Sequence, residues 1–354
     1  MMRWENVKMI RNIYGRLCDQ QSRDIFEARL TCLISGNLDG FTDWFLAEHK
    51  ELHCPELEEY EKGSDSTEYI LFGTGCEGKK AYKILKACHK KMIGWSDNNR
   101  VLWGTDIEGM PVIMPGRLIE NYQDKTIIIT VKYNLLEIYQ QLLMIGFPRD
   151  KIIIPKNGFL LAFCGEQYFD MFSAEKNEIF VDAGSWDGES SVKFVKWCGG
   201  DENYEKIYAF EPDENCWGIC EKSFKESGIE KLEFIKKAVW KRSDILSFQG
   251  IGIGSSNIRE NSSIYKVPVV SIDEILMGKQ VTFIKLDVEG SEMAALEGAS
   301  ESIRRWKPKL AVSVYHKPED LWTLASYIIE LNPNYNLYLR HYTTCNYETV
   351  LYAI

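Results

Sequence analysis

The sequence predicts an α/β protein in which a helical segment precedes two Rossmann-like units. Short apolar runs alternate with amphipathic stretches from Tyr69 onward and again from Glu178 onward, which is the pattern of parallel sheets with crossover helices. In both series the first apolar run leads into a glycine-rich turn. The chain of 354 residues is long enough for two domains. The expected boundaries are 1–62 for the helical segment, 63–156 for the first unit and 157–354 for the second.

Composition and charge exclude several classes of protein. Hydrophobic residues make up 45% and charged residues 27% of the chain, which is ordinary for a globular protein. The net charge of −10 disfavours a nucleic-acid partner, because a polyanion would be repelled. No apolar run suggests a membrane span or a signal peptide, so a cytoplasmic protein with reduced thiols is expected. His49, His53 and Cys54 lie close together, but no second ligand pair follows at zinc spacing, so no metal site is predicted.

The helical segment is expected to contain at least two helices. Apolar residues recur at intervals of three and four between Ile10 and Leu17, and a second helix is predicted over 22–35. Gly36 fits the end of that helix. The sequence leaves open whether the segment forms a contact in a homodimer or a lid.

The first Rossmann-like unit carries a turn with the pattern G-x-G-x-x-G at Gly73, Gly75 and Gly78. Asp97 follows Gly78 by 19 residues at the end of the next strand, where a ribose-binding acid is expected. One interpretation is a nucleotide site. The other is a scaffold that positions an acceptor or a partner, because Glu77 would bring a negative charge close to a diphosphate. The elements expected in this unit are strands at Tyr69–Phe72, Met92–Trp95, Thr126–Val131 and Ile152–Ile154, and helices at Lys79–His89 and Leu135–Gly146.

The second unit is expected to contain five crossover strands followed by a terminal hairpin. Residue types suited to a nucleoside ligand follow the first two strands. Asp182 begins a turn in which Gly184 and Gly188 allow a close backbone approach, and Glu211 ends the next strand, where it could bind ribose hydroxyls. Pro212 stops that strand. The strands are predicted at Glu178–Asp182, Lys206–Phe210, Leu232–Lys237, Val281–Asp287, Lys309–Tyr315, Tyr335–His341 and Tyr347–Ile354.

Candidate catalytic groups follow the fourth and fifth strands of this unit. Asp287, Glu289 and Glu292 follow the fourth strand, and His316 follows the fifth. A histidine beside carboxylates at the edge of a sheet is a candidate general base. We expect either Asp287 or His316 to be the base and the other to orient it. Glu289 and Glu292 also suit a helix N-terminus, where the dipole favours acids, and no spacing among these oxygen ligands demands a metal.

The third strand ends near residues that allow two interpretations. Ala238 and Val239 could line an adenine pocket or could be plain core residues. Asp244 could instead contact the adenine or could be a turn residue.

These motifs resemble the FkbM family of methyltransferases over about 200 residues. The residues that carry the resemblance are the Asp182–Gly188 turn, Phe210-Glu211-Pro212, the string K-L-D-V-E-G-S-E at 285–292 and the string Y-H-K-P-E-D at 315–320. The resemblance implies the seven-stranded Rossmann-like class I methyltransferase fold, with S-adenosylmethionine as cofactor. It also implies methyl transfer to a hydroxyl of a glycan, nucleotide sugar or secondary metabolite, but it does not name the acceptor. A non-catalytic methyltransferase fold kept for binding is a further interpretation.

The resemblance also implies roles for individual residues. Asp182 would attract the ammonium group of the cofactor, and Glu211 would bind its ribose. Asp287, His316 and Glu289 would serve catalysis. The expected cofactor-binding residues are Asp182, Gly184, Ser185, Asp187, Gly188, Glu211, Pro212, Ala238, Val239 and Asp287.

The first unit is similar to small nucleotide-sugar-binding domains that precede polysaccharide-modifying enzymes in bacteria. Tyr69–Arg100, Gly109–Val112 and Pro115 carry this likeness. It implies a site for a UDP- or CDP-sugar, or for NAD, at Gly73, Gly75, Gly78 and Asp97, in a bifunctional or nucleotide-sugar-gated protein.

Overall fold

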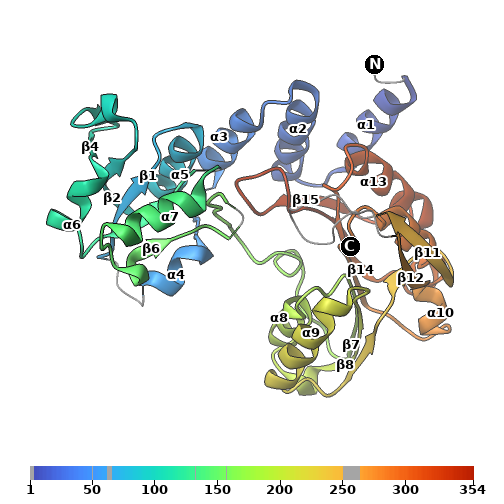
Figure 1. The fold of residues 1–354 in the computed structure, drawn as a ribbon. Helices are drawn as coiled ribbons and strands as arrows, with labels where there is room; N and C mark the ends of the chain where they lie inside the picture. The colour runs from blue at the N-terminus through green and yellow to red at the C-terminus, as the bar shows by residue number, and fades with distance from the viewer. Residues whose placement is uncertain (1–3, 50, 62–65, 132, 157, 250–263) are drawn as a thin grey trace. The chain divides into compact units, whose positions relative to one another are not determined.

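A computed structural model describes residues 4–49, 51–61, 66–131, 133–156, 158–249 and 264–354 (Figure 1). The chain forms two compact units. The C-terminal unit comprises Met1–Gly36, Gly165–Tyr342 and Asn346–Ile354, and the N-terminal unit comprises Asn37–Cys164 and Thr343–Cys345. The boundaries expected at residues 62–63 and 157 fall on residues outside the described part of the chain.

The helical segment expected at 1–62 is divided between the two units. Asp19 caps α2 and its carboxylate pairs with Arg340 of the C-terminal unit at 2.7 Å, so α1 and α2 belong there. Asp39 of α3 pairs instead with Lys80 of the N-terminal unit at 2.9 Å. These ion pairs could not be foreseen from the helical pattern alone. The helices are α1 (Trp4–Arg16), α2 (Gln20–Ser35), α3 (Leu38–Glu48) and α4 (Pro55–Glu61).

The N-terminal unit is built on a six-stranded sheet with the order β3-β4-β2-β1-β5-β6. All neighbouring strands are parallel except β3 and β4. Residues of β1 are buried on both faces of the sheet, as expected of a parallel sheet covered by helices. The four expected strands are present, and the short β3–β4 hairpin was not predicted. The elements are β1 (Glu68–Phe72), α5 (Cys76–Ala87), β2 (Lys91–Ser96), β3 (Asp106–Ile107), β4 (Met110–Ile113), α6 (Leu118–Asn121), β5 (Thr126–Ile129), α7 (Leu135–Met144) and β6 (Ile152–Ile153).

The C-terminal unit is built on a seven-stranded sheet with the order β15-β16-β14-β13-β7-β8-β9. Only β16 runs antiparallel to its neighbours, which confirms the predicted fold of five crossover strands and a terminal hairpin. The strand order reverses beside β7, and ligands of such sheets bind at this switch point. The strands are β7 (Glu178–Ala183), β8 (Tyr204–Phe210), β9 (Leu232–Ile235), β13 (Phe283–Leu286), β14 (Lys309–Ser313), β15 (Leu337–His341) and β16 (Thr349–Ala353).

Helices cover the seven-stranded sheet, and α1 and α2 add to it. Helix α1 packs against α13, and α2 packs against β15 (Figure 1). Among the described residues, no helix has both the length and the apolar character needed to cross a membrane. The helices are α8 (Glu189–Trp197), α9 (Glu214–Glu226), α10 (Ile272–Leu276), α11 (Glu292–Glu297), α12 (Ser300–Trp306) and α13 (Asp320–Leu331).

A second, three-stranded sheet with the order β10-β12-β11 lies between β9 and α10 in the sequence. The third strand, expected at Leu232–Lys237, ends at Ile235, and the following residues pass into this small sheet. Its strands are β10 (Ala238–Val239), β11 (Asp244–Gln249) and β12 (Ile264–Val270).

Candidate active site

The glycine turn after β7 is fixed by close packing. Gly184 has a φ of 89°, and a Cβ atom there would lie 1.9 Å from the carbonyl oxygen of Asp287. Gly188 has a φ of 82°, and its Cβ would lie 2.7 Å from the ring of Phe224. Ser185 between them is buried and donates its hydroxyl to a backbone carbonyl within the turn. Glycine is therefore required to bring the turn against the end of β13.

Asp182 at the end of β7 is fully buried and already has partners. The hydroxyls of Ser190 and Ser191 each donate to it at 2.7 Å, and Lys285 Nζ lies 3.2 Å from its Oδ1. Lys285 also donates to the carbonyl of Gly184 at 2.6 Å. Burial opposes a charge on Lys285, but the Asp182 carboxylate raises the pKa of this amine. Lys285 of the adjacent strand thus neutralises Asp182, and Lys285 binds the turn directly.

Glu211 at the end of β8 is only 4% exposed and faces the turn. One carboxylate oxygen accepts the N–H of Trp186 and the other accepts the N–H of Asp213, both at 2.8 Å. Burial raises the pKa of this carboxyl, and the two backbone donors oppose the rise. Each oxygen keeps lone pairs for further donors, so the site fits the hydroxyls of a ribose. Pro212 follows Glu211, and Asp187 of the turn accepts a backbone N–H at the start of α8 at 2.9 Å.

The residues expected beside an adenine lie in the small sheet. Val239 is buried, Ala238 is partly exposed, and both pair with β12. Asp244 begins β11, and its carboxylate accepts the N–H of the next residue at 2.8 Å. These contacts fit the core and turn interpretations of the three residues.

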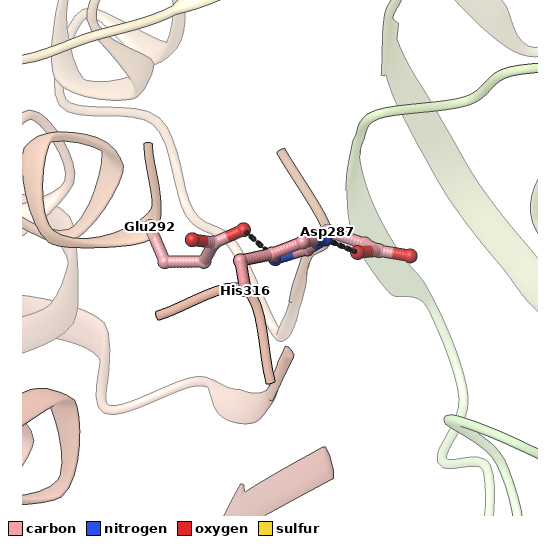
Figure 2. Close-up of side chains that lie close together, drawn as sticks. All are labelled: Asp287, Glu292 and His316. Carbon is pink, nitrogen blue, oxygen red and sulfur yellow. Dashed lines mark ion pairs between the residues drawn. The ribbon is translucent and has the colours of Figure 1, made fainter. Parts of the chain in front are cut away.

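His316 lies between two carboxylates, as Figure 2 shows. Its Nδ1 is 2.9 Å from Glu292 Oε1, and its Nε2 is 3.5 Å from Asp287 Oδ1. Neither contact has the alignment of a directed hydrogen bond, so both are ion pairs. Glu292 is itself held by the N–H groups of Val288 at 2.9 Å and Gly290 at 3.3 Å. Glu292 at the start of α11, His316 after β14 and Asp287 after β13 thus lie in a row.

The charge on His316 follows from these neighbours. Burial alone would lower its pKa, but Glu292, Asp287 and Glu289 together raise the pKa to about 9. Glu289 contributes through Oε2, which lies 3.4 Å from Nε2. The imidazole therefore carries a proton at neutral pH and is placed to orient the carboxylates around it.

Two tyrosines also hold Asp287. Tyr168 donates to Oδ2 at 2.8 Å, and Tyr315 donates to Oδ1 at 3.2 Å. Burial raises the pKa of both phenols, so both stay protonated donors. No sequence pattern indicated Tyr168, which precedes the expected first strand. Tyr315 was visible only as the neighbour of His316.

Glu348, which precedes β16, is a further site residue that sequence reasoning missed. Gln167 donates its amide to Glu348 Oε2 at 2.5 Å. Next to Glu348, the ring of Tyr347 packs edge-on against Tyr315, 6.1 Å between centroids. Burial, and then the charge of Asp287, raise the pKa of Glu348 to about 7. Nothing in the local pattern of a terminal hairpin indicates such a position.

Asp287, Glu292 and His316 also form a group whose ligand atoms lie within 4.8 Å of one another. Carboxylate oxygens and a ring nitrogen are ligands that divalent cations accept. Here, however, the two carboxylates face different nitrogens of the same ring. A cation would take only one of these nitrogens, so the arrangement suits a chain of ion pairs better than a metal centre.

The N-terminal unit brings its own predicted residues together. Gly73 has a φ of 115°, and a Cβ on Gly78 would lie 2.0 Å from the carbonyl oxygen of Gly73. Gly75 is the N-cap of α5 and makes no side-chain cap hydrogen bond. Asp97 accepts the N–H of Thr74 at 2.9 Å and its hydroxyl at 2.7 Å. The turn and the acid therefore meet at the ends of β1 and β2.

Comparisons with known proteins agree with these two units. Residues 182–347 match the methyltransferase FkbM domain, and residues 66–153 match the C2185-like N-terminal domain. The methyltransferase FkbM of Methylobacillus flagellatus KT is 19% identical, with 92% of this chain and 100% of that chain covered and a TM-score of 0.48. An rRNA methylase of Streptococcus thermophilus is 16% identical, with 51% and 89% covered and a TM-score of 0.33.

A further structure, of a protein from Streptococcus mutans assigned as a methyltransferase, contains SAH. It is 14% identical, covers 51% of this chain and 92% of its own, and has a TM-score of 0.31. No curated protein matches the sequence. The domain match and the strand order agree on the C-terminal unit. The chain thus contains, at residues 182–347, an S-adenosylmethionine-dependent methyltransferase domain of the FkbM family, preceded by a C2185-like domain.

Proposed function

We propose that this protein O-methylates a hydroxyl of a glycan, a nucleotide sugar or a secondary metabolite. The observation that carries the proposal is the position of Asp287, which follows β13 beside the glycine turn and is held by Tyr168, Tyr315 and His316. S-adenosylmethionine supplies an already activated methyl group. The protein then has to align the acceptor oxygen and to receive its proton, and alignment is worth up to roughly 7–11 kcal/mol.

Asp287 is the proposed general base. An alkyl hydroxyl is a weak nucleophile at neutral pH, and a positioned base raises the rate by about 10²–10⁴-fold. The proton already on His316 leaves that ring unable to accept another, which favours Asp287 over His316 for this role. His316 orients Asp287, Glu292 holds His316, and Glu289 contributes its charge from the exposed side.

The proposed cofactor contacts centre on Glu211 and the turn. Glu211 accepts the ribose hydroxyls, while Gly184, Ser185, Asp187 and Gly188 shape the adjoining turn. Asp182 is given a supporting role, because Lys285 and two serine hydroxyls already surround it.

The experiment is a single-turnover methylation assay over a panel of UDP-sugars and simple glycosides. Asp287→Asn should lower the methylation rate by about 10²-fold or more, because the amide cannot take the proton. Glu297→Gln, an exposed change on α11, serves as the matched control. Full activity of both Asp287→Asn and His316→Gln would contradict the assignment. A folded wild-type protein that binds no SAH would remove the proposal altogether.

A second candidate function is nucleotide-sugar binding by the N-terminal unit. The amides at the start of α5 have no side-chain cap, and such amides suit a phosphate. The charge of Glu77, which spoke against this site, is partly offset by Lys80, whose Nζ lies 3.7 Å away. Titration of the protein with UDP-glucose and UDP-galactose, with Gly75→Asp as the variant, tests it. Binding that Gly75→Asp leaves unchanged would place the ligand elsewhere.

A further inference from the structure

Four non-glycine residues of the C-terminal unit near the proposed site adopt the left-handed backbone region. Tyr168, Trp186, Glu289 and Glu348 all have a positive φ, between 51° and 72°. This conformation costs free energy for a bulky residue and persists only where the surroundings enforce it. Tyr168 donates to Asp287 and Glu289 lies beside His316, whereas Glu348 accepts a hydrogen bond from Gln167. Trp186 is the remaining one, and it lies in the glycine turn rather than beside the catalytic carboxylate.

The backbone of Trp186 is held at both of its polar atoms. Its N–H donates to Glu211 Oε2 at 2.8 Å, and its carbonyl accepts the thiol of Cys220 at 3.0 Å. Glu211 and Cys220 are both buried, so neither anchor is free to move away. The strained conformation is therefore imposed by the core of the unit.

The side chain that results from this arrangement is exposed. Trp186 keeps 47% of its surface in contact with solvent, at the carboxyl edge of the sheet. A large apolar ring gains nothing from this position in the free protein, because its burial would be favourable. Glu211 and Cys220 thus hold Trp186 in a strained conformation whose cost is not offset by burial of the indole in the free protein.

We propose that the indole of Trp186 packs against the nucleoside part of bound S-adenosylmethionine and forms the outer wall of its site. This inference rests on the proposed cofactor site at Glu211. In the proposed site, the Glu211 carboxylate binds both the Trp186 N–H and the ribose hydroxyls. The side chain of Trp186 therefore starts next to the ribose. Contact with the ribose and adenine would bury the exposed ring, and the free energy gained would offset the cost of the strained turn.

The test is calorimetric titration with SAH of the wild type and of three variants. Trp186→Ala should bind SAH about tenfold or more weakly, and Trp186→Phe should stay within roughly threefold of the wild type, because a smaller ring keeps part of the contact. Trp4→Ala is the matched control, since Trp4 is also exposed but lies on α1. This control should bind SAH as the wild type does.

A third variant separates the strain from the contact. Trp186→Gly should bind SAH as weakly as Trp186→Ala but melt at a higher temperature than Trp186→Ala, because glycine adopts the left-handed conformation without strain. Normal SAH affinity in folded Trp186→Ala and Trp186→Gly would overturn the inference and leave the acceptor as the partner of the indole. If the wild type itself fails to bind SAH, the cofactor site at Glu211 is wrong as well, so the two failures are distinguishable.

Discussion

The two glycine turns of this protein share a local design but differ in what they pack against. In each unit a strand leads into a turn, and an acid from the next strand accepts an N–H of that turn. In the N-terminal unit a Cβ on Gly78 would strike Gly73, a residue of the same turn, at 2.0 Å. In the C-terminal unit a Cβ on Gly184 would strike the carbonyl of Asp287 at 1.9 Å. Only the second turn is therefore locked to a strand end with candidate catalytic groups.

The acids that follow the second strand of each unit, Asp97 and Glu211, differ in their hydrogen-bond donors and in the direction of their pKa shifts. Asp97 accepts two donors from Thr74 and the N–H of Asn99, and these hydrogen bonds outweigh burial and lower its pKa. Among the described residues, Glu211 accepts donors from two backbone N–H groups, and burial raises its pKa. The first carboxylate is well satisfied within the protein, whereas the second gains from further donors. A glycine pattern followed by an acid is thus weak evidence for a ligand until the partners of the acid are known.

The largest expected effect is a loss of stability when a Cβ atom is added to a glycine of either turn. Gly184→Ala should destabilise the C-terminal unit by on the order of 4 kcal/mol, because the new Cβ meets backbone and the positive φ is strained. Gly78→Ala should destabilise the N-terminal unit by a similar amount. Urea unfolding measures both. SAH binding should disappear in Gly184→Ala and persist in Gly78→Ala, and its loss in both would mean that the two units do not respond independently.

The second effect is a pH dependence of stability that has opposite signs in the two units. The pKa of His316 is raised from an ordinary 6.5 to about 9, so its stabilising contribution is complete below pH 6.5 and is lost as the pH rises through 9. The loss should amount to about 3 kcal/mol. His49 of the N-terminal unit has its pKa lowered by burial, so its effect has the opposite sign and appears as the pH falls below 6.5.

Urea unfolding at pH 6.5 and at pH 9.5 measures this dependence. The difference between the wild type and His316→Gln isolates the histidine from the thiols and lysines that titrate in the same range. An equal loss of stability in both proteins would mean that His316 is neutral in the folded state, which would reopen its role as the base.

The third effect concerns the two acids. Glu211→Gln should weaken SAH binding by about 10–100-fold, because hydrogen bonds to a charged acceptor are worth roughly 1.5–3 kcal/mol. Asp97→Asn should leave SAH binding unchanged. Calorimetric titration of both variants measures this contrast. Equal SAH affinities in the two variants would contradict the proposal that Glu211, and not Asp97, binds the cofactor.

The sequence predicted the strands and the acids at their ends but not the hydrogen-bond partners of those acids. Strands are readable because each is a short apolar run bounded by turn residues, and strand ends then locate Glu211, Asp287 and His316. Sheet register sets Lys285 opposite Asp182, and nothing local in the sequence reveals this pairing. Tyr168 reaches Asp287 across 119 residues of sequence, a contact that only the folded chain creates.

The smallest expected effect is that of chelation, and it tests the line of Glu292, His316 and Asp287. Treatment with EDTA should change neither SAH affinity nor the methylation rate by more than about twofold, because each carboxylate faces its own ring nitrogen and the imidazole holds a proton where a cation would bind. Among the described residues this is the one such group of potential ligands. A loss of activity that Mg²⁺ or Mn²⁺ restores would show that His316 gives up its proton to a metal ion. The row of ion pairs would then be the metal-free form of a metal centre. The two units would then differ in metal binding as well as in how their glycine turns pack.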